Sequence, residues 1–161
     1  MAFMAKHKEI HATFVEKKYI NGIKIPVESS GTLEFVAPST MIKKTMLPKP
    51  EMFKLTDNTI TMERKGKMRS LQVEDYPDLA IYFEGIRALL GGNTDGMTRL
   101  YKACLTGSAA DWELVLHPLK EGMTLKTLSL NGDQDNVKSV KVQLKDGDYS
   151  IMYISRMDMT Q

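Results

Sequence analysis

Few residues in this sequence have the type and spacing that catalysis or metal binding requires. His7 and His11 stand four residues apart, which on a helix would place two possible metal ligands on one face. No carboxylate or third ligand is placed beside them, so we interpret them as surface or capping histidines. The sequence therefore predicts no metal site.

Two further groups could transfer protons. Asp75 and Asp78 flank Tyr76-Pro77 and could perform acid–base chemistry, but a turn that enters a helix also favours Asp at such positions. His117 precedes a proline and has no serine or cysteine signature around it. The G-x-S-x-G, G-x-G-x-x-G and phosphate-loop patterns are absent. We therefore expect a binding protein without a cofactor rather than an enzyme.

The length and composition of the chain limit the classes of protein to which it can belong. The 161 residues fit one domain, residues 1–161, with a single core. A net charge of +2 without a basic stripe and interleaved aromatics argues against nucleic acid. The basic run from Arg64 to Arg69 is interpreted as a solvated hairpin tip, with contact to acidic lipid headgroups or an acidic partner as the alternative. The single cysteine, Cys104, excludes an internal disulfide.

The start of the chain shows no signal-peptide pattern, because no apolar run follows its early lysines. No stretch approaches the roughly 20 apolar residues that cross a bilayer as a helix.

Alternation of apolar and polar residues dominates the chain and predicts strands. We expect a first strand from about His11, and a hairpin over residues 59–73 that turns at Lys65-Gly66. Further turns are predicted at Asn131-Gly132-Asp133 and Asp146-Gly147-Asp148. The pattern as a whole indicates a long antiparallel β meander.

One segment interrupts the meander with a helical pattern. Pro77 and Asp78 suit a first helical turn, apolar residues follow at helical spacing, and Gly91-Gly92 would end the helix. A shorter helix is predicted around residues 95–100. A strongly curved sheet needs its concave side covered, so we expect a mainly β protein with a helical lid (α+β).

The order of several short motifs resembles the LolA-like family, the outer membrane lipoprotein carrier protein superfamily, and within it a LolA-related subgroup. The motifs run from about Phe14 to Met157 and include Phe14-Val15-Glu16-Lys17-Lys18-Tyr19, Ile25-Pro26, Ser29-Ser30-Gly31-Thr32-Leu33, Arg87-Ala88-Leu89-Leu90-Gly91-Gly92 and Trp112-Glu113-Leu114-Val115-Leu116-His117-Pro118. The resemblance implies a half-open, curved antiparallel β barrel whose apolar concave side is covered by helices.

The resemblance also implies a function. LolA receives the acyl chains of a lipoprotein at the inner membrane and carries them across the periplasm. The resemblance therefore implies that this chain is a periplasmic carrier of a lipidated protein or lipid cargo. It also implies two partners, an inner-membrane transporter or exporter and an outer-membrane acceptor. We expect a monomer. LolA proper has an arginine that latches its lid, in a P-x-R-L-x-W pattern, where this chain has Thr40 and Lys43. This difference argues against the same latch.

The strand patterns and the resemblance together predict which side chains face the cavity. The predicted lining residues are Leu33, Phe35, Met41, Phe53, Leu55, Ile60, Met62, Leu71, Trp112, Leu114, Leu116, Val140, Val142, Ile151 and Tyr153. The predicted lid residues are Leu79, Phe83, Ile86 and Leu90. These residues could also fill a dry core, because alternation identifies an inward face but not a cavity.

Three functions therefore remain open. The first is a periplasmic carrier for the acyl chains of a lipoprotein or other lipidic cargo, for which the 12 methionines offer adaptable apolar contacts. The second is a non-enzymatic adaptor module that docks on an inner-membrane lipid or polyene exporter. The third is a small hydrolase or isomerase that uses the cavity as its active site.

Overall fold

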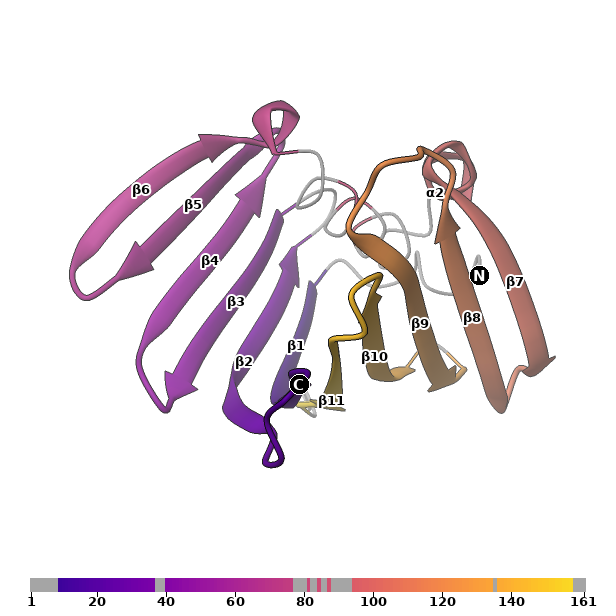
Figure 1. Ribbon diagram of the computed structural model, residues 1–161, viewed down its shortest axis with the longest axis horizontal. Helices are drawn as coiled ribbons and strands as arrows, with labels where there is room; N and C mark the ends of the chain where they lie inside the picture. Colours follow the sequence, from indigo (N-terminus) through magenta and orange to yellow (C-terminus); the bar gives the residue numbers. More distant parts are fainter. Residues whose placement is uncertain are drawn as a thin grey trace.

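The protein is an antiparallel β meander wrapped into a curved sheet (Figure 1). The computed structural model describes residues 9–36, 40–76, 81, 84, 87, 94–134 and 136–157. The elements are β1 (Glu9–Tyr19), β2 (Val27–Val36), β3 (Thr40–Leu47), β4 (Glu51–Thr56), β5 (Thr59–Arg64), β6 (Lys67–Gln72), the 3-10 turn η2 (Val73–Asp75), the helix α2 (Thr94–Leu100), β7 (Tyr101–Ser108), β8 (Asp111–Pro118), β9 (Leu125–Asp133), β10 (Asn136–Leu144) and β11 (Tyr149–Arg156).

All these strands form one 11-stranded sheet in the order β6-β5-β4-β3-β2-β1-β11-β10-β9-β8-β7. The two edge strands, β6 and β7, are therefore consecutive strands in the chain although they lie at opposite edges of the sheet (Figure 1). The sheet curls without closing, which confirms the predicted half-open antiparallel barrel.

Local turn chemistry sets most of the hairpins as expected. Lys65 and Gly66 form the β5–β6 turn with positive φ angles of 53° and 76°, a geometry that suits a tight hairpin. The backbone N–H of Asp148 donates to the Asp146 carboxylate at 2.9 Å in the β10–β11 turn. The first strand begins at Glu9, close to the predicted start at His11.

The turn predicted at residues 131–133 is wrong, because these residues belong to β9. Gly132 lies opposite Trp112 of β8, and a Cβ atom there would lie 2.4 Å from the carbonyl oxygen of Asn136 and 2.5 Å from the indole carbon Cζ2. The absent side chain leaves room for the ring, whose Nε1–H donates to the carbonyl of Gln134 at 2.9 Å. This glycine permits close approach of the Asn136 backbone and the Trp112 ring within the sheet, and it does not form a turn.

Helical structure is found where the sequence predicts it. The short helix α2 covers residues 94–100, and Ile81, Glu84 and Arg87 are helical. The predicted lid residues Leu79, Phe83, Ile86 and Leu90 lie outside the described residues, as do Pro77 and Asp78. No helix in the described part of the chain is long and apolar enough to cross a membrane.

Candidate ligand-binding site

The strand pairing defines which side chains share the inner face of the sheet. Directly opposed residues of an antiparallel pair project to the same face. Phe14 of β1 opposes Ile154 of β11, while Glu16 opposes Met152. All four side chains therefore project to one face, and the burial of Phe14 and Met152 identifies this face as the inner one.

Most predicted lining residues share this inner face. By register they are Leu33, Phe35, Met41, Phe53, Leu55, Ile60, Met62, Leu71, Trp112, Leu114, Leu116, Val140 and Val142. Their role in binding a ligand stays a prediction. Several inner-face residues were absent from the predicted set: Phe14, Tyr101, Leu125, Leu128, Leu130 and Met152. Alternation within β1 and β9 could have identified Phe14, Leu128 and Leu130.

The predicted inward orientation of Ile151 and Tyr153 is wrong. Both lie on the outer face, because Met152 between them opposes the inward-facing Glu16. Tyr153 is 48% exposed and pairs with the exposed Val15. Strand β11 has apolar residues on both faces, so alternation alone does not show which face is buried. Pairing with β1 and β10 decides which face points inward.

The inner face carries two apolar clusters. The larger cluster includes Phe14, Ile81, Met97, Tyr101, Trp112, Leu114, Leu116, Met123, Leu125, Leu128, Leu130, Val137, Val140 and Met152. The smaller cluster consists of Met41, Leu55, Ile60 and Val73, with Phe53, Met62 and Leu71 packed against it. The β1–β2–β3–β4 region joins the two clusters.

An ion pair lies between these apolar clusters. The Lys43 ammonium Nζ lies 3.1 Å from Glu16 Oε1 and 5.1 Å from the centre of the Phe14 ring. By register, Lys43 stands between Leu33, which packs on the larger cluster, and Phe53, which packs on the smaller one. The whole of Glu16 is only 6% exposed, so its carboxylate depends on this partner for compensation of its charge.

The sequence pattern marks Lys43 only as a departure from the LolA latch and does not predict a role for Glu16. A signal was present, since Ala12, Phe14 and Glu16 share one phase of β1 and the first two are apolar. A charged residue in the inward phase of a strand requires a partner, but the sequence does not show which lysine or arginine provides it.

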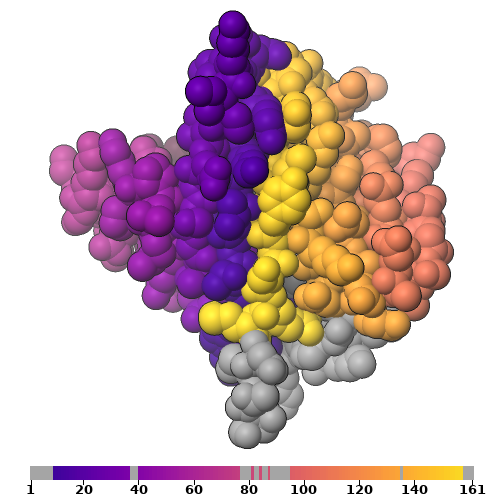
Figure 2. All heavy atoms as spheres, turned by 90° about the horizontal axis from the view of Figure 1, so that it is seen from below, coloured from indigo at the N-terminus to yellow at the C-terminus, as the bar shows by residue number. Residues whose placement is uncertain are grey.

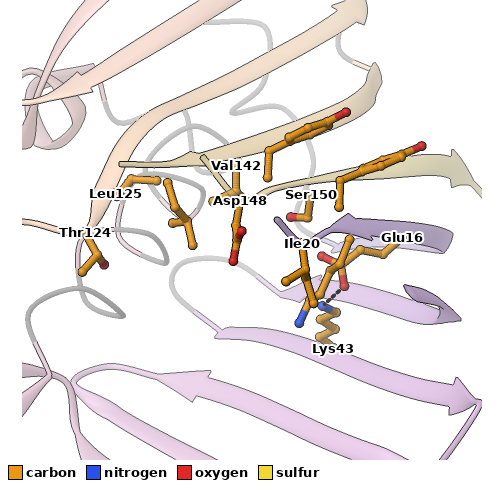
Figure 3. Close-up of a pocket in the computed structure, with 12 residues that line it drawn as sticks. Glu16, Ile20, Lys43, Thr124, Leu125, Val142, Asp148 and Ser150 are labelled. Carbon is orange, nitrogen blue, oxygen red and sulfur yellow. Dashed lines mark hydrogen bonds and ion pairs between the residues drawn. The ribbon is translucent and has the colours of Figure 1, made fainter. Parts of the chain in front are cut away.

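A cavity of about 480 Å³ opens beside this ion pair (Figure 3). Its volume lies in the range of small-molecule sites. The aliphatic wall consists of Ile20, Leu125, Val142 and Leu144. The Glu16–Lys43 pair lies at one side of the cavity, joined by the dashed line in Figure 3. The site therefore combines an apolar wall with the Glu16–Lys43 ion pair and two further charged lining residues, Lys18 and Asp148.

The described helical residues Ile81, Glu84 and Arg87 make contacts with both halves of the sheet. The Tyr101 hydroxyl of β7 donates to the backbone carbonyl of Ile81, whose side chain is buried in the larger cluster. Arg87 pairs with Glu84 and donates from Nη1 to the carbonyl of Asp57, in the β4–β5 turn, at 2.6 Å. These contacts tie Ile81 to β7 and Arg87 to the β4–β5 turn.

The candidate catalytic and metal residues do not assemble into a site in the part of the chain that the structure describes. Asp75 lies exposed in η2 and His117 exposed in β8, whereas His11 contacts Glu9 and Glu34 on β1 and β2. His7 lies outside the described residues. Across those residues, no group of three potential His, Cys, Asp or Glu metal ligands is present.

The fold and the site define the class of this protein. It is a half-open antiparallel barrel around a cavity with an apolar wall, with helical residues between its two edge strands. The sequence profile of the family described as "Outer membrane lipoprotein carrier protein LolA-like" matches residues 2–155. The chain therefore belongs to the LolA-like family, as its motifs indicated. No curated protein gives a significant sequence match.

Solved structures support the fold assignment. A LolA superfamily protein from Nitrosomonas europaea is 8% identical with a TM-score of 0.55, and the match covers 99% of this chain and 90% of that chain. A DUF1329 family protein from Desulfovibrio piger is 10% identical with a TM-score of 0.53, and the match covers 98% and 89% of the two chains. At these identities the similarity concerns the fold.

Proposed function

We propose that this protein is a periplasmic carrier that binds acyl chains of a lipoprotein or another lipidic cargo in its cavity and passes them toward the outer membrane. The observation that carries the proposal is the apolar cavity of about 480 Å³ on the inner face of a LolA-like sheet. In this role the protein would receive cargo from an inner-membrane transporter or exporter and deliver it to an outer-membrane acceptor, acting as a monomer.

The energetics suit reversible transfer. Burying a chain of about 12–16 carbons gives a gross gain of roughly 10–13 kcal/mol at ~0.8 kcal/mol per CH₂. Association costs of about 4–15 kcal/mol offset much of that gain. The Glu16–Lys43 pair limits the apolar surface that a chain can contact, which also favours release. Net binding of moderate strength is what a carrier requires.

The proposal predicts that a bulky residue in the cavity wall blocks lipid uptake. Ser150 of β11 lines the cavity, so Ser150→Phe should fill free space and lower the uptake of a fluorescent fatty acid at least about fivefold, because the ring occupies the volume that several methylenes would take. Uptake is measured by fluorescence titration, and the stoichiometry by native mass spectrometry.

The matched control is Ser155→Phe on the same strand. Ser155 is exposed on the outer face, opposite Thr13, so this variant should take up lipid as the wild type does. Circular dichroism verifies that both variants are folded. Equal uptake by the two variants, or no lipid-sized adduct on the wild type, would contradict the carrier and favour the adaptor that docks on an exporter without binding lipid.

A further inference from the structure

The most unusual surface of the protein is formed by three loops at one end of strands β1–β6. We call it the hairpin rim and define it as residues 20–26, 44–52 and 63–69. The antiparallel order of the strands places the β1–β2, β3–β4 and β5–β6 connections at this end. Figure 1 shows them along the lower left edge of the molecule.

The hairpin rim exposes large aliphatic side chains. Ile23, Ile25, Met46, Leu47 and Met68 are each between 54% and 77% exposed. Single exposed apolar residues are ordinary, whereas a group of them at the tips of adjacent hairpins indicates an interaction surface. The rim is therefore a candidate for contact with an apolar phase.

The same surface concentrates positive charge. The hairpin rim contains seven basic and two acidic residues, a net charge of +5, while the whole chain has a net charge of +2. The basic residues are Lys24, Lys44, Lys49, Arg64, Lys65, Lys67 and Arg69. One of them, Arg64, pairs with Glu51 at 3.0 Å. The rest of the chain is thus net negative, and the rim is the pole that an anionic surface attracts.

Two of the three loops of the hairpin rim lie next to each other. A hollow of about 810 Å³ is lined jointly by Lys44, Met46 and Lys49 from the β3–β4 end and by Arg64 and Lys65 from the β5–β6 end, so these two tips lie side by side. Figure 2 shows the β1–β2 hairpin, in indigo, projecting beyond its neighbours.

The β1–β2 loop is also anchored. The backbone N–H of Asn21 donates to the Asp148 carboxylate at 2.9 Å, and Ile23 N–H donates to the Ile20 carbonyl at 3.0 Å. These bonds hold the loop in a fixed conformation that leaves its isoleucines exposed.

We propose that the hairpin rim docks on the surface of an anionic lipid bilayer. Aliphatic tips can enter the interface while the neighbouring ammonium and guanidinium groups contact lipid phosphates, a combination typical of membrane-surface binding. Nucleic acid fits less well, because the rim offers no aromatic platform for bases. Ile20 both begins the β1–β2 loop and lines the cavity, so docking brings the cavity wall next to the lipid phase.

Co-sedimentation of the full chain with vesicles tests this proposal. Vesicles of phosphatidylcholine with about one third phosphatidylglycerol should bind the protein at least about tenfold more strongly than pure phosphatidylcholine, and added salt should reduce the difference. Ile23→Ser/Ile25→Ser and Lys65→Glu/Lys67→Glu should each lower the partition coefficient for the anionic vesicles about tenfold or more.

Two control variants lie elsewhere on the sheet. Leu105→Ser on β7 removes an aliphatic side chain that is 55% exposed, and Lys102→Glu/Lys126→Glu reverses two exposed charges on β7 and β9, as the rim variant does. Both should bind vesicles as the wild type does. The cavity variant Ser150→Phe should also keep vesicle binding, which separates docking from cargo uptake. Equal binding to both vesicle types, or losses in the controls that match those in the rim variants, would overturn the proposal and leave an acidic protein surface as the rim's partner.

Discussion

Replacing Lys43 by methionine should lower the free energy of unfolding by about 2–4 kcal/mol, because it removes the partner of a buried carboxylate. Glu16 Oε1 lies 3.1 Å from Lys43 Nζ, and the Glu16 side chain is only 8% exposed. A fully buried broken pair costs about 3–5 kcal/mol. The lysine side chain is 25% exposed, so water can partly solvate the site and the expected loss is somewhat smaller. Urea unfolding monitored by tryptophan fluorescence measures it.

The double variant Glu16→Leu/Lys43→Met gives the sharper result. It removes both charges and leaves apolar side chains of similar size, so its stability should lie within about 1 kcal/mol of the wild type or above it. The cost of the single change therefore comes from the unpaired carboxylate and not from lost packing. A double variant as unstable as Lys43→Met would contradict this explanation.

Lys141 provides a matched control for the aromatic contact of Lys43. Its ammonium lies 4.9 Å from the centre of the Tyr149 ring, on the exposed side of β10. Exposed cation–π contacts contribute about 0.5–1 kcal/mol, so Lys141→Met should cost less than about 1 kcal/mol. A loss equal to that of Lys43→Met would attribute the effect to the aromatic contact instead of the ion pair.

Gly31→Ala should be the other strongly destabilising change, with a loss of more than about 3 kcal/mol in the free energy of unfolding. Gly31 opposes Thr45 at the point where the β2–β3 register shifts. A Cβ atom at this position would lie 1.8 Å from the carbonyl oxygen of Lys44 and 2.9 Å from Cα of Thr45. Both neighbours are backbone atoms, so the clash is relieved only if β3 moves away from β2.

The adjacent residue supplies the control for Gly31. Ser30→Ala keeps a Cβ atom where one already exists and pairs with Leu47 across the same strands, so its cost should be below about 1 kcal/mol. Thermal unfolding followed by circular dichroism compares the two variants. If Gly31→Ala unfolds at the temperature of Ser30→Ala, then β2 and β3 do not approach as closely as this structure shows.

The sequence by itself determined the strands, most of the turns and the class of fold. Alternation of side chains and the chemistry of turns such as Lys65-Gly66 are local properties, carried by residues close in the chain. The ordered motifs from Phe14 onward indicated the LolA-like family, and the family profile confirmed it. Most of the predicted lining residues share the inner face because alternation along each strand is also a local property.

Tertiary structure decided the features that depend on pairing between distant segments. The phase of β11 follows from its neighbours, which turn Ile151 and Tyr153 outward. Gly132 is required both by the nearby Asn136 carbonyl of its own hairpin and by the indole ring that packs over it from β8, and only the second contact depends on a distant segment. The Glu16–Lys43 pair joins positions 27 residues apart, and curvature of the sheet brings it to the cavity. Alternation defines two faces of a strand, but only the partner strands decide which face is buried and which charges meet there.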